Sequence, residues 1–383
     1  MAAGSQELIR DMNYHKILET IIEKGLISRA DLSKQLGLTK ATISSQVQAL
    51  MDDGLVEETG SLETSKGRRP IMLKFRGAHA HVLSLDIGLT HINLLLSDLL
   101  GQHCYSRQIL WDKDNGELLP LLSTTIDDIL HSPKESSQNI IGICLGIHGV
   151  VHENNILFTP YYNLEHTPLK EELEQRFQLP VFIENEANLS ALGEKTFCFG
   201  ASNLVNISVH SGIGLGIIMN GNLYSGANGF AGEFGHTIVE PNGRSCPCGN
   251  QGCIEQYASE AAILRKYNQL KNTTNSTIDD LVRDYQKKEG AAVFAISDFI
   301  SYMAIGINNI VNIFNPQLIV INSTITAYLP DVTNQIAEKL TNPMSRQCKI
   351  VPSTLQDTAT LLGGVYLCSR HYLGIENFCP PLT

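Results

Sequence analysis

Three cysteines and one histidine lie close together in the middle of the chain. They are Cys246, Cys248, Cys253 and His236. Three thiolates and one imidazole complete the closed tetrahedron of a structural zinc site and leave no position for a reactive water. We therefore predict a structural Zn²⁺ and no metal catalysis. The alternative, from these residues alone, is that the cysteines are buried or disulfide-bonded.

The spacing of these residues requires a compact knuckle. In an extended strand Cys246 and Cys248 would be too far apart to reach one ion, so the chain must turn between them. Pro247 marks that turn. Gly249 and Gly252 supply the backbone freedom that brings the third cysteine round to the same ion.

The composition is that of a globular protein large enough for two or three domains. The chain has 383 residues, 43% of them hydrophobic and 17% charged. No apolar stretch approaches the ~18 residues that would span a bilayer, and no basic segment followed by an apolar core opens the chain. We expect a cytoplasmic protein with no membrane partner. Nine cysteines, an odd number, fit a reducing compartment.

The N-terminal part of the chain predicts three short helices. Apolar residues recur at helical spacing over residues 9–22. Ser28 would cap a second helix, with Asp31 three residues on, and Gly37 would end it. Thr39 would cap a third helix, whose apolar stripe points inward and leaves a small polar face outward. That face comprises Thr39, Lys40, Ala41, Ser44, Ser45 and Gln48.

The second and third helices form a helix-turn-helix whose small polar face fits a DNA major groove. Two strands, over residues 55–58 and 71–75, flank a loop with a basic tip that suits phosphates or a narrow minor groove. The basic residues of this wing are Lys66, Arg68 and Arg69. The net charge of −11 does not oppose DNA binding, because residues 1–76 are close to neutral. The alternative is a solvated three-helix interaction domain with a charged loop.

The remaining chain alternates strands with helical stretches, which predicts an α/β domain of two lobes. The expected strands cover residues 82–88, 92–98, 140–147, 205–209 and 318–321. The glycine-rich residues 212–216 lack the dinucleotide-binding spacing and precede a hairpin, for which Asn220-Gly221 is the expected turn. A tight turn near a ligand is therefore favoured over phosphate binding.

These features resemble the ROK family, which groups sugar kinases with sugar-responsive repressors. The knuckle with its Glu233-x-x-His236 lead-in is similar to the family's signature, and Asp86-Ile87-Gly88 is similar to the start of its kinase phosphate loop. In the family only the repressors carry a winged helix-turn-helix in front. Residues 67–70 and 182–188 are most similar to the xylose-responsive repressors of Gram-positive bacteria.

The resemblance implies an N-terminal winged helix-turn-helix, α with a small β wing, followed by a two-lobe α/β actin-like domain of ribonuclease H type with a structural zinc knuckle. The DNA-binding domain would cover residues 1–76 and the sugar-binding domain residues 77–383. Its first lobe would cover about 77–195 with a C-terminal helix over about 365–383. The second lobe would cover about 196–364, and sugar would bind in the cleft.

By the same resemblance, five residues would hold the sugar hydroxyls. They are Asn185, Glu186, Glu233, His236 and Glu255. One ring nitrogen of His236 would ligate zinc and the other would donate to a hydroxyl, while carboxylates accept charge-assisted bonds from neighbouring hydroxyls. The alternatives are that Glu233 and Glu255 only support the zinc ligands, and that Asn185 and Glu186 belong to a capped loop.

Three departures from the family's kinases favour a protein that is not an enzyme. Leu89 stands where the kinases have a second glycine and would crowd an approaching phosphate. Glu186 replaces a catalytic aspartate, and its extra methylene displaces a base that must lie within ~3 Å of its proton. Asn322-Ser323-Thr324 replaces paired glycines beside the nucleotide. His148 replaces a proline, either as a sugar contact or as a loop histidine.

The sequence thus predicts a repressor that binds operator DNA and is released by a small sugar, with D-xylose favoured. A two-fold operator requires two copies, so we expect a homodimer or tetramer. The alternative function is a ROK sugar kinase with an accessory DNA-binding head. The sequence also leaves open a phosphorylated sugar or a protein partner as the effector.

Overall fold

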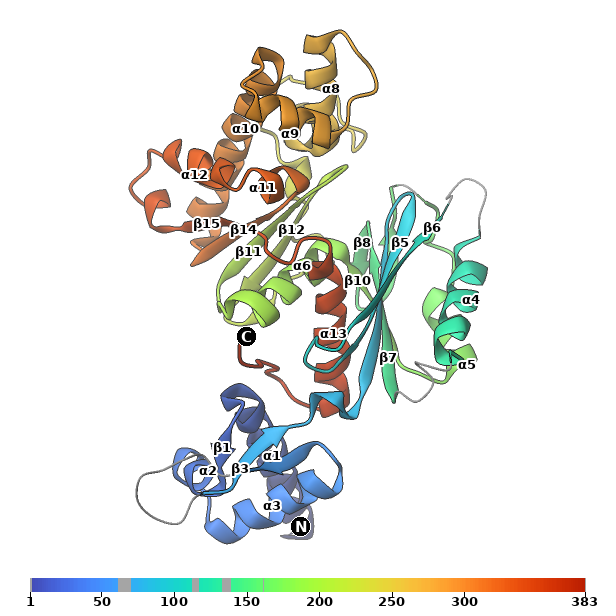
Figure 1. Cartoon of the computed structure of the whole chain (residues 1–383), viewed down its shortest axis with the longest axis vertical. Coiled ribbons are helices and arrows are strands. Elements are labelled where there is room, and N and C mark those ends of the chain that lie inside the picture. The colour runs from blue at the N-terminus through green and yellow to red at the C-terminus, as the bar shows by residue number, and fades with distance from the viewer. Residues whose placement is uncertain (1, 61–69, 112–116, 133–138, 161, 383) are drawn as a thin grey trace. The chain divides into compact units, whose positions relative to one another are not determined.

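The computed structural model describes residues 2–60, 70–111, 117–132, 139–160 and 162–382 (Figure 1). Internal contacts divide the chain into two compact units. Unit 1 comprises Met1–His148, Phe158–Glu184 and Gly364–Thr383, and unit 2 comprises Gly149–Leu157 and Asn185–Gly363. The domain boundaries expected from the sequence stay predictions.

The N-terminal head of unit 1 has the three predicted helices and a small antiparallel sheet of order β1-β3-β2 (Figure 1). The side chain of Ser28 accepts a hydrogen bond from the backbone N–H of Asp31, and Gly37 ends the second helix at φ 66°. Thr39 caps the third helix by accepting from the N–H of Thr42. These caps confirm the expected start and end of α2 and the expected start of α3, whereas α1 is longer than the expected 9–22. The elements are α1 (Ala2–Lys24), β1 (Ile27–Ser28), α2 (Arg29–Leu36), α3 (Lys40–Asp52), β2 (Val56–Thr59) and β3 (Met72–Phe75).

The rest of unit 1 is built on a five-stranded sheet of order β10-β7-β4-β5-β6, with β4 parallel to β7 and antiparallel to β5. Helices α4 and α5 lie on one side of this sheet and α13 lies on the other (Figure 1). Gly364 lets α13 approach closely, because a Cβ there would lie 2.2 Å from Oγ of Ser84. The elements are β4 (His81–Ile87), β5 (His91–Asp98), β6 (Tyr105–Leu110), α4 (Leu118–Leu130), β7 (Ile140–Ile147), α5 (Leu169–Phe177), β10 (Val181–Asn185) and α13 (Thr358–Leu373), which belongs to this unit from Gly364 onward.

Unit 2 holds a second five-stranded sheet, of order β13-β12-β11-β14-β15, and the hairpin β8-β9. Asn220 and Gly221, both at positive φ, turn the chain between β12 and β13 as predicted. The elements are β8 (Val150–His152), β9 (Asn155–Phe158), α6 (Glu186–Glu194), β11 (Leu204–Val209), β12 (Ile213–Met219), β13 (Asn222–Leu223), α7 (Glu255–Ala258), α8 (Glu260–Lys271), α9 (Ile278–Gln286), α10 (Gly290–Phe314), β14 (Leu318–Asn322), α11 (Thr324–Tyr328), α12 (Asp331–Glu338) and β15 (Lys349–Pro352).

The glycine-rich run after β11 is only partly the tight turn that we expected. Gly212 does lie in the turn, where its carbonyl accepts from the N–H of His210. Gly214 and Gly216, however, are residues of strand β12, and α6 packs directly on them. A Cβ at Gly216 would lie 2.3 Å from the carbonyl oxygen of Ala187. These two glycines therefore position the start of α6.

Helix α10 corrects one expectation from the sequence. By length and composition alone it could cross a membrane. Half of its most apolar stretch is buried within the structure. Phe299, Met303 and Ile307 are fully buried in the core of unit 2, so α10 is a core helix of this unit.

Candidate functional site

The predicted metal ligands come from one irregular segment between β13 and α7 of unit 2. His236 ends a short 3-10 turn, Phe234–His236, and the cysteines follow on the next loop. That loop turns at Cys246, whose carbonyl accepts from the N–H of Gly249 at 3.0 Å. Gly249 and Gly252 have φ of 97° and 84°. The sequence-based role of both glycines is thus confirmed.

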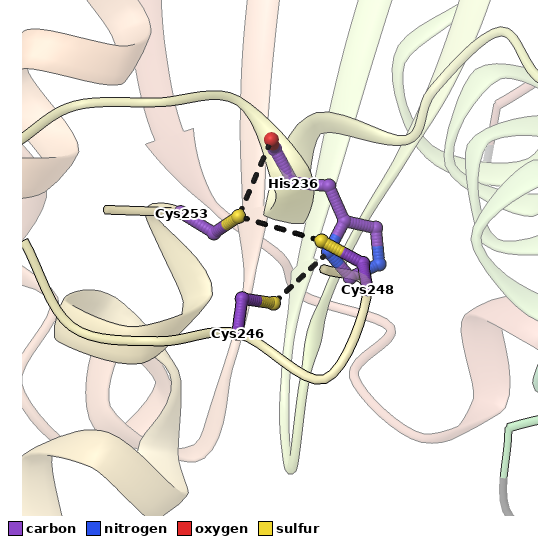
Figure 2. A group of neighbouring side chains, drawn as sticks. All are labelled: His236, Cys246, Cys248 and Cys253. Carbon is purple, nitrogen blue, oxygen red and sulfur yellow. Dashed lines mark hydrogen bonds between the residues drawn. The ribbon is translucent and has the colours of Figure 1, made fainter. Parts of the chain in front are cut away.

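The four side chains converge on one point (Figure 2). Sγ of Cys246 lies 3.5 Å from Nδ1 of His236, and Sγ of Cys248 lies 3.7 Å from Sγ of Cys253. All four ligand atoms lie within 4.8 Å of one another. A tetrahedral zinc ion would separate sulfur from sulfur by about 3.8 Å and sulfur from nitrogen by about 3.6 Å. The residues can therefore hold a metal ion, and their geometry and donor types fit zinc.

Two carboxylates flank the imidazole of His236. Oε2 of Glu233 lies 3.7 Å from Nε2, and Oε1 of Glu255 lies 3.6 Å from Nδ1. Oε1 of Glu255 also accepts a hydrogen bond from Sγ of Cys246 at 3.1 Å. Burial raises the pKa of Glu233, His236 lowers it, and the carboxylates of Glu186 and Glu255 raise it again. Three of the predicted sugar-binding residues are thus gathered round one ring.

Asn185 and Glu186 lie at the start of α6. Oδ1 of Asn185 accepts hydrogen bonds from the N–H groups of Ala187 at 2.9 Å and of Asn188 at 3.1 Å. Its Nδ2 donates to the carbonyl of Gly149 at 2.8 Å. Asn185 is therefore the N-cap of α6, and this cap fixes the position from which Glu186 projects. Sugar contact by either residue stays a prediction.

In unit 1, Asp86 of the kinase-like loop faces a histidine. Nε2 of His148 lies 3.5 Å from Oδ1 of Asp86. The backbone N–H of His148 donates to the hydroxyl of Tyr162 at 3.1 Å, and that hydroxyl donates to the carbonyl of Ile87 at 2.9 Å. The sequence singled out both His148 and Asp86 but gave no sign that they pair, because Asp86 lies on β4 and His148 follows β7, far along the chain.

A second polar network occupies the segment Asn322-Ser323-Thr324. Oε1 of Glu260 accepts a hydrogen bond from the N–H of Thr324 at 2.7 Å. The N–H of Glu260 donates to the carbonyl of His210 at 2.9 Å. Burial raises the pKa of Glu260, and neighbouring His210 lowers it. Sequence analysis missed Glu260, because its distance along the chain from Thr324 hides the contact.

The predicted DNA-contacting face of α3 is exposed. All six of its predicted residues are open to solvent, opposite the buried Ile43, Val47 and Leu50. Nε2 of Gln48 donates to Oδ1 of Asp52 at 2.8 Å, which holds that side chain along the helix. The wing residues Lys66, Arg68 and Arg69 lie outside the described part of the chain.

Known proteins match both the N-terminal head and the rest of the chain. The model of the ROK family matches residues 82–371, and a winged helix-turn-helix DNA-binding model matches residues 15–57. The chain is 36% identical to a xylose repressor of Bacillus spizizenii, over 98% of this chain and 99% of that protein.

Two solved structures are similar to this one. A ROK family transcriptional regulator, a homologue of the Escherichia coli Mlc protein, has a TM-score of 0.81 and 29% identity over 96% of this chain and 98% of its own. A ROK glucokinase from Streptomyces griseus, in complex with glucose and AMPPNP, has a TM-score of 0.65 and 25% identity. The glucokinase covers 75% of this chain and 99% of its own.

Proposed function

The chain belongs to the ROK family and carries a winged helix-turn-helix, and from this premise we propose that it is a transcriptional repressor that D-xylose releases from operator DNA. The proposal rests on how much of this chain each similar protein covers. The regulator structure covers 96% of this chain, whereas the glucokinase structure covers 75%. Similarity to a xylose repressor runs over 98% of the chain. Such a protein acts on DNA in the cytoplasm.

In this proposal Asn185, Glu186, Glu233, His236 and Glu255 hold the sugar. Carboxylates accept charge-assisted hydrogen bonds from neighbouring hydroxyls, which is how a polyol is recognised. The closeness of Glu233 and Glu255 to the His236 ring supports a shared ligand. Asn185 supports it by capping α6, since that cap holds Glu186 in place.

We propose Zn²⁺ as the metal of the cysteine cluster. A closed site of three thiolates and one imidazole supplies rigidity and no reaction chemistry. The chain's own part is to hold Nδ1 of His236 at the cluster, so that Nε2 carries the hydrogen and can donate it to a sugar hydroxyl. Nδ1 faces Cys246 and Nε2 faces Glu233, which supports these separate roles for the two nitrogens.

The alternative of a sugar kinase has less support. Asp86 is engaged by His148, and Leu89 follows it where a small residue would admit phosphate. Glu260 ties down the backbone of Thr324, in the segment where the family's kinases have glycines beside the nucleotide. We infer that the protein performs no phosphotransfer.

Release would follow from a change in the preferred arrangement of a dimer's two heads. A sugar that binds one arrangement better shifts the population toward it. If that arrangement does not span two half-sites about one DNA turn apart, operator affinity falls. The coupling is reciprocal, so operator DNA weakens sugar binding by the same factor.

The test is a fluorescence-anisotropy titration of an operator selected by the protein from random duplexes. Saturating D-xylose should weaken operator binding, and calorimetry with and without operator should return the same factor for xylose. Arabinose, glucose and phosphorylated pentoses serve as comparison ligands. Operator affinity unchanged by every sugar would rule out induction by sugar. ATP turnover that Glu186→Gln abolishes would establish the kinase instead.

A further inference from the structure

Helix α13 crosses from unit 2 into unit 1. Its first residues, 358–363, belong to unit 2, and the rest of the helix, from Gly364 onward, belongs to unit 1. Residues 374–382, which we call the tail, follow α13 and also belong to unit 1, as does α1 of the head. Helix α13 and its tail therefore form a continuous connection from unit 2, where α6 carries Glu186, to the unit that contains the DNA-binding head.

Within unit 2, the start of α13 packs backbone against backbone on α6. A Cβ at Gly193 of α6 would lie 2.1 Å from the carbonyl oxygen of Ala359. A Cβ at Gly363 of α13 would lie 2.0 Å from the carbonyl oxygen of Leu189. Neither point has room for a side chain, and close-packed elements transmit a displacement to each other. A shift of α6 must therefore move the start of α13.

Buried hydrogen bonds fasten the same joint. Oγ1 of Thr360 donates to the carbonyl of Glu186 at 3.3 Å. Nδ2 of Asn322 donates to Oγ of Ser190 on α6 at 3.3 Å and to the carbonyl of Gln356, just before α13, at 3.1 Å. Asn322 and Ser190 are buried, where hydrogen bonds are stronger than in water. Asn322 thus ties α6 to the segment that leads into α13.

At the other end of α13, the tail contacts α1. Oε1 of Glu19 accepts hydrogen bonds from the backbone N–H groups of Glu376 at 3.0 Å and of Asn377 at 2.9 Å. Such bonds to a carboxylate are charge-assisted. Further along the tail, Pro381 lies against the end of α1, because a Cβ at Gly25 would lie 2.9 Å from Cγ of Pro381. We call the contacts of Glu19 and Gly25 with the tail the clasp.

The tail is also packed firmly against α13. Phe378 is fully buried, and its ring centroid lies 6.4 Å from that of Tyr366 on α13. Gly374 ends the helix at φ 62°, and a Cβ there would lie 2.9 Å from Nε2 of His15 on α1. The end of α13, the tail and α1 therefore lie in close contact.

We propose that Glu19 is the positioning residue through which α13 and its tail pass the state of the sugar site to the DNA-binding head. The inference rests on the proposed function, since sugar at Glu186 and operator DNA at the head are its two ligands. A sugar held by Glu186 shifts α6, and the close-packed joint moves α13 with it. Small shifts of a helix are a known form of allosteric transition. The clasp then repositions α1, although the head does not touch the sugar.

Operator titrations of the full-length, metal-loaded protein with and without saturating D-xylose test the clasp. The ratio of the two operator affinities is the coupling factor. Glu19→Ala removes the acceptor of both tail N–H groups and should lower this factor by about fivefold, while xylose affinity without operator stays unchanged. Glu19→Gln keeps a carbonyl oxygen as acceptor and should stay within about twofold of the wild type. Glu23→Ala, at an exposed residue of α1, is the matched control.

The coupling factor distinguishes positioning from support. A tail that only stabilised the head would lower the melting temperature of Glu19→Ala and leave the coupling factor as in the wild type. That result would overturn the proposal.

A disulfide across the clasp should reverse the loss. A Cβ at Gly25 would lie 3.8 Å from Cβ of Pro381, a separation that suits a disulfide. Gly25→Cys and Pro381→Cys are added to Glu19→Ala, with Cys379→Ser to remove the neighbouring thiol. The oxidised protein should regain the coupling factor, and dithiothreitol should abolish it again. Two cysteines that do not bridge, or a bridge without effect on coupling, would overturn the proposal.

Hydrogen exchange tests the path through α13 without sugar or DNA. The N–H groups of Glu376 and Asn377 should exchange faster in Glu19→Ala, because their acceptor is lost. They should also exchange faster in Asn322→Ala, although Asn322 lies in the other unit. Asn334→Ala, at an exposed residue of α12, should leave them unchanged. The N–H groups of β4 report any general loss of stability.

The two kinds of failure are distinguishable. Tail exchange unchanged by Asn322→Ala would overturn the path through α13, even if xylose releases the protein from DNA. A faster tail exchange in Asn322→Ala, together with operator binding that no sugar alters, would support the path and refute the proposed function instead.

Discussion

Nε2 of His236 lies 3.7 Å from Oε2 of Glu233, while Nδ1 of the same ring lies 3.5 Å from Sγ of Cys246. One imidazole thus joins the cysteine cluster to the carboxylates that we assign to the sugar. A ring held at one nitrogen presents the other in a fixed direction and tautomer. Metal content and sugar affinity should therefore change together.

Replacing Cys248 by serine tests that link. Cys248 is exposed, so the loss of its thiol removes a metal ligand without opening a cavity in the core. We expect Cys248→Ser to lose its metal, to unfold at lower temperature and to bind D-xylose about tenfold or more weakly. Elemental analysis, thermal melts and calorimetry measure the three effects. Cys379→Ser, at another exposed cysteine, is the matched control. A metal-free, stable Cys248→Ser protein with unchanged xylose affinity would break the link.

Lys40 tests the DNA-binding face of α3. It is exposed at the start of the helix, where a cation can neutralise one phosphate. Lys40→Ala should weaken binding to any duplex and lower the slope of log affinity against log salt by about one. Lys287→Ala, at an exposed lysine of unit 2, should change neither. If Lys40→Ala leaves the salt dependence as in the wild type, α3 does not approach the phosphates as proposed.

The sequence predicted best what is decided locally. Ser28 and Thr39 cap their helices because a hydroxyl reaches an N–H three residues on, which is visible in the sequence itself. The four residues of the cysteine cluster could also be predicted, because His236 and the cysteines lie in one short segment of the sequence. The contacts of Asp86 with His148 and of Glu260 with Thr324 join residues far apart in the chain. Only strand order and helix packing bring them together.

The same limit applies to the glycine-rich run. From the sequence, Gly214 and Gly216 indicated a turn beside a ligand. In the structure they make room for α6 on strand β12, and no local pattern distinguishes a glycine that frees the backbone from one that admits a neighbouring helix. Their effect on the site is indirect, through the position of Glu186.

Restoring two residues of the family's kinase pattern should not give the protein kinase activity. The double variant Leu89→Gly, Glu186→Asp restores a small residue in the phosphate loop and the shorter base. We expect no ATP turnover above background with pentoses or hexoses, because Glu260 still holds the backbone of Thr324. A coupled ATP-consumption assay measures this, with the Streptomyces griseus glucokinase as positive control. Sugar-dependent turnover by the double variant would show that the nucleotide side is intact.

Glu194 gives a prediction about pH and stability. Its side chain is fully buried in unit 2, where Oγ of Ser353 donates a hydrogen bond to Oε1, and Oε2 has no hydrogen-bond partner among the described residues. Burial raises the pKa of Glu194 from 4.5 to about 7, against the lowering effect of Ser353. The folded protein therefore keeps this proton over a pH range in which the unfolded chain has lost it.

The sign of the effect follows from that difference. As pH rises from 4.5 to about 7, the free energy of unfolding should fall, by about 3 kcal/mol in total from this group. Glu194→Gln has no carboxyl to ionise, so its stability relative to the wild type should rise by about that amount over the same interval. Urea denaturation at a series of pH values measures the difference, and Glu338→Gln, at an exposed glutamate, should follow the wild type. Parallel pH profiles of stability for the wild type and Glu194→Gln would mean that folding does not raise the pKa of Glu194.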